Sequence, residues 1–347
     1  MKPLPTLKSI ANELEISANT VSRALRNDPK ISEATRKRVR NVAKRVGYRS
    51  NAFAASLVHH RISKGNRRFK AILGLLVGHP EKNPLKHLSD YQRVLAGAKN
   101  RAEKQGYQIE PHWAYQPGIK PRRLHQILQS KGVPGLILLG MNPLEIKLPF
   151  GHYACSMAAP SGFEIKSSLF SFATIDPYDL VQLAADRLVK QGRKRIGLAL
   201  AHHFELNASG RYYASLNAFH RSCCQLPKIC PIPLFVWDEK HPLPTRQFKA
   251  WIRRYRPDVV LTINTSSRLK AQLEPPDRRA ISFVDLDLEP DNKSFAGTVR
   301  PHEEIGAAAV DLVIGALYRN ERGFPGSLKG VFLQASWRSK DSLKQSL

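Results

Sequence analysis

The most chemically suggestive residues lie in the stretch ISANTVSRAL, Ile16 to Leu25, and just beyond it. If this stretch is a helix, its polar side carries short or cationic residues where a solvated helix would more often carry Glu and Lys: Ala18, Asn19, Ser22, Arg23 and Arg26. In a major groove Asn can pair with adenine and Arg with guanine, while Ala leaves room for a thymine methyl group. A second set can donate to phosphates without reading sequence: Thr20, Ser22 and Ser32. Periodicity alone leaves two interpretations open, a helix that only packs in a trihelical unit and a helix that reads DNA.

Three short helices are predicted around this stretch. Apolar residues recur at helical spacing, with one interruption, in TLKSIANELEISANTVSRAL, and again in SEATRKRVRNVAKRVGY. A side-chain oxygen that can cap free backbone N–H groups precedes each periodic run, at Thr6, Ser17 and Ser32. Two helices joined by a short turn, with a third behind them, predict a helix-turn-helix unit with a small apolar core.

The segment YRSNAFAASL, Tyr48 to Leu57, follows the third helix. Asn51 can cap a short Ala-rich helix there, and Leu57 has little to bury on so marginal a helix in a monomer. Residues 6–57 as a whole resemble the DNA-binding head and hinge of the lactose-repressor (LacI) family. The matching elements are T-V-S-R, I-S-E-A-T-R-K-R-V, G-Y and N-x-x-A-x-x-L, all without a gap.

The resemblance implies a hinge helix at residues 51–58 that pairs with its twin in the minor groove. Leu57 would wedge into the central base step, with Ala54 on the face of close approach; packing of Leu57 on the next domain stays open. The implied DNA-binding residues are Thr6, Ser17, Ala18, Asn19, Thr20, Ser22, Arg23, Arg26, Ser32, Thr35, Tyr48, Asn51, Ala54 and Leu57. Glu15 occupies a turn position that is often Gly in the family, so we expect a left-handed backbone there at a cost of about 1 kcal/mol.

Beyond a polar, basic linker, apolar runs alternate with helical segments in two series. The first runs from AILGLLVG to YACSMAA, and the second from FATIDP to the helix that ends near Tyr318. Alternation of strand and helix predicts parallel sheets with right-handed crossovers, hence two doubly wound lobes. The expected domains are residues 1–58 with the hinge helix, the linker 59–70, and the lobes 71–347. Ligands of such sheets bind beyond the carboxyl ends of the strands, in the cleft.

The LacI resemblance continues more weakly through these lobes as a periplasmic-binding-protein-like effector domain. Its marks are KQGRKRIGLAL, the Arg before YYASLNAF, the Asn ending LTIN and the Asp after ISFV. It implies effector-binding residues that hold the hydroxyl groups of a sugar or the polar edge of another small molecule: Asp176, Arg211, Asn264 and Asp285. Two alternatives stay open. Asp176 and Asn264 could only cap helices or loops, and Thr265 and Leu286 stand where the family often has Asp, which leaves room for an effector other than a simple sugar.

Composition narrows the class of protein. Of 347 residues, 55 are Lys or Arg and 28 are Asp or Glu, a net charge of +27, and residues 1–70 hold 17 cations against 4 anions. A polyanionic partner is therefore expected. The amino-terminal residues lack the apolar core of a signal peptide and no apolar run is long enough to span a membrane, so we expect a cytosolic protein. The four cysteines fit reduced thiols without zinc spacing: Cys155, Cys223, Cys224 and Cys230.

No nucleophile elbow, phosphate-binding loop or metalloprotease motif is present, and the pairs His59/His60 and His202/His203 are expected in linker and loop. We therefore expect no enzyme, metal or cofactor. The predicted protein is a homodimeric transcriptional regulator, more a repressor than an activator, with an all-α head and hinge helix joined to the two-lobed α/β domain. Its partners would be a near-palindromic operator and a small-molecule effector, with no membrane. The alternative is a solute- or sugar-binding protein without a gene-regulatory role, which would need a signal peptide.

Overall fold

The computed structural model describes residues 7–25, 28, 31–46, 70–79, 83–141, 143–160, 169–223, 231–238, 241–289 and 291–339. The chain divides into two compact units, residues 1–68 and 69–347. Several predictions lie outside the described residues: Thr6, Arg26, Tyr48, Asn51, Ala54, Leu57, the hinge helix 51–58 and the linker up to residue 69. Ser22 belongs to a described helix, but its side chain is outside the described part.

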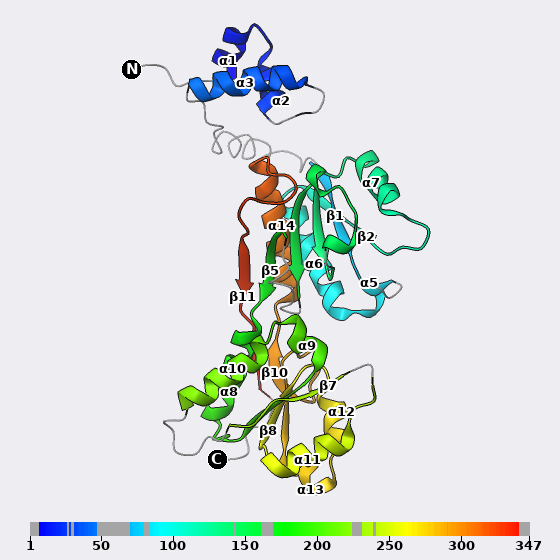
Figure 1. Ribbon diagram of the computed structural model, residues 1–347, viewed down its shortest axis with the longest axis vertical. Coiled ribbons are helices and arrows are strands. Elements are labelled where there is room, and N and C mark those ends of the chain that lie inside the picture. Colours follow the sequence, from blue (N-terminus) through cyan, green and yellow to red (C-terminus); the bar gives the residue numbers. More distant parts are fainter. Residues whose placement is uncertain are drawn as a thin grey trace. The chain divides into compact units, whose positions relative to one another are not determined.

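The first unit contains a three-helix head, formed by α1 (Leu7–Leu14), α2 (Ala18–Leu25) and α3 (Glu33–Arg45) (Figure 1). Its core is made of the apolar stripes predicted from the sequence, and the buried members are Ile10, Ala11, Val21, Ala24, Val39 and Ala43. Ser17 Oγ accepts the backbone N–H of Thr20 at 3.0 Å and Ser32 Oγ that of Thr35 at 3.2 Å, which confirms both predicted caps. Glu15 has φ 56°, so the expected left-handed turn is also confirmed.

The second unit begins with a lobe, the N-lobe, built on a parallel six-stranded sheet in the order β11-β5-β4-β3-β1-β2. The strands are β1 (Ala71–Val77), β2 (Tyr107–Trp113), β3 (Gly135–Leu139), β4 (Ala154–Ala159), β5 (Ser171–Ile175) and β11 (Gly330–Leu333). The helices are α5 (Pro84–His87), α6 (Ser89–Lys104), α7 (Pro121–Ser130) and α14 (His302–Tyr318), with short 3-10 turns at Pro143–Glu145 and Phe150–His152.

The C-lobe carries a second six-stranded sheet in the order β12-β10-β9-β8-β6-β7. Its strands are β6 (Ile196–Ala201), β7 (Phe235–Trp237), β8 (Val259–Thr262), β9 (Ser282–Asp285), β10 (Ala296–Val299) and β12 (Ser336–Arg338). The helices are α8 (Pro177–Lys190), α9 (His202–Asn207), α10 (Arg211–Cys223), α11 (Thr245–Tyr255), α12 (Ser266–Ala271) and α13 (Pro275–Ala280). All strand pairs are parallel except β10 with β12, so the predicted two parallel-sheet lobes are confirmed with one antiparallel edge.

The division between the lobes differs from the two series read along the sequence. FATIDP opens the second series, but its strand β5 pairs with β4 and completes the N-lobe sheet, and α14 also belongs to the N-lobe. The chain therefore crosses between lobes three times, after β5, between β10 and α14, and between β11 and β12. The sequence did not predict these crossings because strand pairing depends on contacts between residues far apart in the chain, which the order of elements does not reveal.

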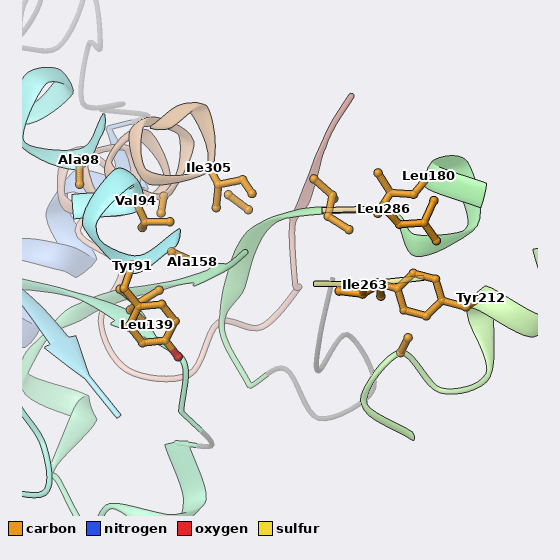
Figure 2. Packing of buried hydrophobic residues seen from close by; sticks show 14 of the residues in the cluster. Tyr91, Val94, Ala98, Leu139, Ala158, Leu180, Tyr212, Ile263, Leu286 and Ile305 are labelled. Carbon is orange, nitrogen blue, oxygen red and sulfur yellow. The ribbon is translucent and has the colours of Figure 1, made fainter. Parts of the chain in front are cut away.

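Glycines let α14 lie directly on α6. A Cβ atom on Gly306 would meet the carbonyl oxygen of Val94 at 2.0 Å, and one on Gly97 would meet that of Glu303 at 1.9 Å. Figure 2 shows Val94 beside Ile305 in this contact. The small residues of α14 therefore pack on α6 as well as on β4 and β5.

Replacing Gly306 with Ala should destabilise the second unit. Alanine favours a helix by about 1 kcal/mol, but here its Cβ meets backbone rather than a movable side chain, and overpacking of that kind costs about 1–3 kcal/mol. Gly315→Ala is the matched control in the same helix, because its Cβ would meet only the end of the Arg319 side chain, at 3.0 Å. Urea unfolding should show a loss for Gly306→Ala and none for Gly315→Ala. Equal stability of the two variants would contradict the backbone contact.

Candidate nucleic-acid interface and candidate effector site

Helix α2 has two different sides. One side packs into the head through Val21 and Ala24, which are fully buried. The other side presents the residues that the sequence predicts to meet DNA: Ala18 and Asn19 are exposed, and Thr20 and Arg23 are partly exposed. The short side chains at the start of the helix leave its backbone open to close approach, as a helix that enters a major groove requires.

Arg23 is engaged by a residue that the sequence reasoning missed. Its Nε donates to Asp28 Oδ2 at 2.8 Å, and the two side chains are 33% and 30% exposed. The backbone N–H of Asp28 also donates to the carbonyl oxygen of Arg23 at 3.1 Å. The only sequence signal was an acidic residue within a strongly basic stretch.

The predicted phosphate-contacting hydroxyl groups occur as two capping pairs. The hydroxyl groups of Ser17 and Thr20 lie 2.8 Å apart, and those of Ser32 and Thr35 are also 2.8 Å apart. Both pairs are exposed at helix starts, where unpaired N–H groups and the helix dipole favour an anion. These four side chains therefore lie where phosphate contacts can form without loss of the caps.

Asp176 and Arg211, two of the predicted effector residues, face each other at the crossover from β5 to α8. Asp176 Oδ1 accepts the N–H of Tyr178 at 2.8 Å, which caps α8, and it also accepts Arg211 Nε at 2.9 Å. Arg211 Nη2 donates to Asp176 Oδ2. The Asp176 side chain is 15% exposed and that of Arg211 is 40% exposed. Asp176 therefore caps α8 and also positions an accessible guanidinium group.

Asn264 and Asp285 form the second predicted pair, but their roles differ. Asp285 is 4% exposed, and its carboxylate accepts the N–H groups of Asn264 and Asp287 and the hydroxyl group of Ser266, at 2.9, 3.1 and 3.0 Å. Burial raises the pKa of Asp285 above its usual value, against the lowering by these hydrogen bonds. Asn264 is exposed, with φ 52°. Asp285 thus supports the loop that presents the Asn264 amide.

Arg300 contacts the residues that follow Arg211 and Asp285 in the chain, and so lies close to both pairs. The sequence analysis did not predict this role. This arginine is 3% exposed and lies between β10 and α14. It donates to the Tyr212 hydroxyl group at 3.1 Å, one residue after Arg211, and to the carbonyl oxygen of Leu286 at 3.2 Å, one residue after Asp285. A third donation, at 3.4 Å, reaches the carbonyl oxygen of Pro160 in the N-lobe.

A cavity of about 110 Å³ lies between the lobes at the carboxyl ends of β3 and β4. From the N-lobe it is lined by Tyr91, Met141 and Pro160 among others, and from the C-lobe by His203, Phe204 and Asn207 of α9. None of the four predicted effector residues lines it. His203, expected in a loop, lies in α9 with its ring 4.0 Å from that of Phe204. Figure 2 shows apolar residues of both lobes in this region, with Tyr91 on the N-lobe side and Tyr212 on the C-lobe side.

A second polar contact joins the lobes at Glu289, in the loop after β9. Ser89 Oγ in α6 donates to Glu289 Oε1 at 2.6 Å, and Arg93 Nη2 lies 3.3 Å from Oε2. Arg338 holds the same loop by donating to the carbonyl oxygens of Glu289 and Asn292, both at 2.7 Å. The Glu289 carboxylate therefore reaches the N-lobe from a loop that is fixed to the C-lobe.

Among the described residues, no group of three or more His, Cys, Asp or Glu side chains could hold a metal ion. Cys155 is a free, buried thiol whose pKa is raised by burial. A search of the same part of the chain for a helix long and apolar enough to cross a membrane finds none.

Replacing Asp285 with Ala should destabilise the C-lobe, because three donors lose their buried acceptor. A buried donor left without a partner costs about 1–3 kcal/mol. Asp291→Ala is the control, since Asp291 is exposed a few residues away and should change stability by less than about 0.5 kcal/mol. Thermal unfolding of both variants measures the difference. A variant at position 285 as stable as the one at position 291 would show that the carboxylate is not a structural support.

Known proteins match this chain in its head and in its fold. Residues 6–51 match the family model described as bacterial regulatory proteins, lacI family. The transcriptional regulator PtxS of Pseudomonas putida is 26% identical over 95% of this chain and 94% of its own length. Catabolite control protein A of Staphylococcus epidermidis is 22% identical over 89% and 91%.

Solved structures show the same fold. A complex of the transcriptional regulator CelR with cellobiose has a TM-score of 0.55 at 18% identity, covering 97% of this chain and 99% of that one. The lac repressor dimer bound to operator and the anti-inducer ONPF has a TM-score of 0.53 at 16% identity, covering 98% and 99%. The head of this chain is thus similar to the lacI family of bacterial regulatory proteins, and its two lobes share the fold of the solved regulators.

Proposed function

We propose that this chain acts as a homodimeric, cytoplasmic repressor whose operator binding is controlled by a small molecule in the cleft between its lobes. It is a DNA-binding transcriptional regulator and not an enzyme. The observation that carries the proposal is the exposed side of α2, with Ala18, Asn19 and Arg23 turned away from the head core. A solute-binding protein without a regulatory role does not account for the DNA-binding residue types on the exposed side of α2.

On DNA, each head places α2 in a major groove. Asn19 pairs with adenine and Arg23 with guanine, while Thr20 and the other capping hydroxyl groups bind phosphates. Two heads related by a two-fold axis require a near-palindromic operator. In this proposal residues 1–58 form the DNA-binding domain, 59–70 the linker and 71–347 the effector domain. The hinge residues Asn51, Ala54 and Leu57 act in the minor groove.

The effector is a small polyhydroxylated molecule such as a sugar. Asp176 offers acceptors and Arg211 offers donors side by side, which suits adjacent hydroxyl groups, and the exposed Asn264 amide offers both. Two solved structures of the same fold support this class of ligand, since CelR is in complex with cellobiose and the lac repressor in its repressed state is bound to ONPG. Asp285 contributes as support of the Asn264 loop.

Binding of such a ligand needs movement of the lobes. The interlobe cavity of about 110 Å³ is smaller than the roughly 300–1,000 Å³ of ordinary ligand pockets. A ligand that prefers a more open or rotated arrangement shifts the population toward it. The contacts of Arg300 and Glu289 would then rearrange, and the spacing of the two hinges in the dimer would change with them.

Replacing Arg23 with Ala should weaken operator binding by about 1–3 kcal/mol and relax specificity, because a bidentate base contact is lost. Arg38→Ala is the control, since Arg38 is an exposed cation of α3 and its loss should weaken binding to operator and random DNA alike. Fluorescence anisotropy with a selected operator and a scrambled duplex measures both. Equal losses on the two duplexes for Arg23→Ala would argue that it does not read bases.

Replacing Arg211 with Ala should abolish the ligand response and leave operator binding without ligand intact. A thermal-shift screen of sugars, nucleosides and organic acids identifies the ligand, since a cleft ligand stabilises the protein by RT ln(1 + [L]/Kd). Arg253→Ala is the control, because Arg253 is an exposed cation of α11, distant in sequence from Arg211. A normal ligand titration in Arg211→Ala would place the effector elsewhere.

A further inference from the structure

Backbone hydrogen bonds on both sides of Asp28 hold its carboxylate beside Arg23. The Asp28 N–H donates to the carbonyl oxygen of Arg23 at 3.1 Å, and the Asp28 carbonyl oxygen accepts the N–H of Ile31 at 3.0 Å. Ile31 packs against the apolar core of the head. Asp28 is therefore anchored to the end of α2 on one side and toward α3 on the other, so that its Oδ2 is a fixed acceptor for Arg23 Nε, at 2.8 Å.

This contact uses one particular part of the guanidinium group. Nε–H lies on the edge nearest the helix, and with Nε engaged the two terminal nitrogens remain at the far end of the side chain. Recognition of guanine O6 and N7 uses two N–H groups of arginine in one plane. A free arginine side chain has many rotamers, and it loses much of this conformational entropy when it reads a base. A neighbour that fixes the plane beforehand lowers the loss on binding.

We propose that Asp28 is a positioning residue that holds Arg23 ready for guanine and so sets sequence specificity without touching a base itself. This inference rests on the proposed function of α2. Two other roles of the pair lead to different results. If the ion pair withholds Arg23 from DNA, replacing Asp28 should strengthen guanine recognition. If the pair only stabilises the head, replacing Asp28 should leave base preference unchanged.

The test selects binding sites for the full-length chain from a pool of random DNA duplexes, and then measures the affinity of the selected site and of its variants at each base. In Asp28→Ala the preference for guanine at the position read by Arg23 should fall about five- to tenfold, within the range of a bidentate base contact. Asp28→Asn should keep most of the preference, because its amide oxygen can still accept from Nε.

Glu33→Ala is the matched control. Glu33 is an exposed acidic residue of the head, and its carboxylate lies 2.7 Å from Arg36 Nη2. Its removal changes the charge by the same amount as Asp28→Ala, so binding to all duplexes should strengthen alike while base preference stays the same. A change of preference in Asp28→Ala that is absent in Glu33→Ala therefore reports positioning and not charge.

An unchanged or increased guanine preference in Asp28→Ala overturns the inference, and so does an equal loss in folded Asp28→Asn and Asp28→Ala. The double variant Arg23→Ala/Asp28→Ala should lose no more preference than Arg23→Ala alone, and an additive loss contradicts action through Arg23. If the wild-type chain enriches no sequence, the proposed function fails as well. If it enriches a site and only the Asp28 results fail, the proposed function stands.

Discussion

A buried guanidinium group constrains how the two lobes can be arranged. Arg300 donates to Leu286 and Tyr212 in the C-lobe and to Pro160 in the N-lobe. Its Nη1 lies 3.3 Å from Asp287 Oδ2, and burial raises the pKa of Asp287 to about 6. A buried charge without partners is strongly destabilising, and Leu286, Tyr212 and Asp287 keep Arg300 partnered within the C-lobe. Of the Arg300 contacts, a change in the arrangement of the lobes therefore has to replace only the one with Pro160.

The candidate effector residues adjoin, along the chain, residues that hydrogen-bond with Arg300. Arg211 precedes Tyr212, and Asp285 precedes Leu286, so both candidate pairs adjoin residues that bind Arg300. A ligand that moved either loop would disturb the contacts of Arg300, one of which reaches the N-lobe. In the proposed function, effector binding and lobe arrangement are coupled through these hydrogen bonds.

Local features of the head were predictable because they depend on residues close in sequence. The caps at Ser17 and Ser32 and the left-handed Glu15 follow from short-range geometry. In the lobes, alternation predicted two parallel sheets, but not that β5 and α14 complete the N-lobe, because strand order depends on contacts distant in sequence. Arg300 and Asp28 were missed for a related reason. The role of a charged residue in a loop is evident only when its partners are known. The resemblance to the LacI family, in contrast, implied candidate site residues from their positions in the sequence.

The most direct test of this account is the operator affinity of the full-length chain with and without the ligand that stabilises it. Coupling between two sites usually amounts to about 1–3 kcal/mol, or roughly 5- to 150-fold in affinity. Operator affinity should change by that factor at saturating ligand, and ligand affinity should change by the same factor when operator is bound. A ligand that binds the cleft tightly and leaves operator affinity unchanged would contradict this expectation.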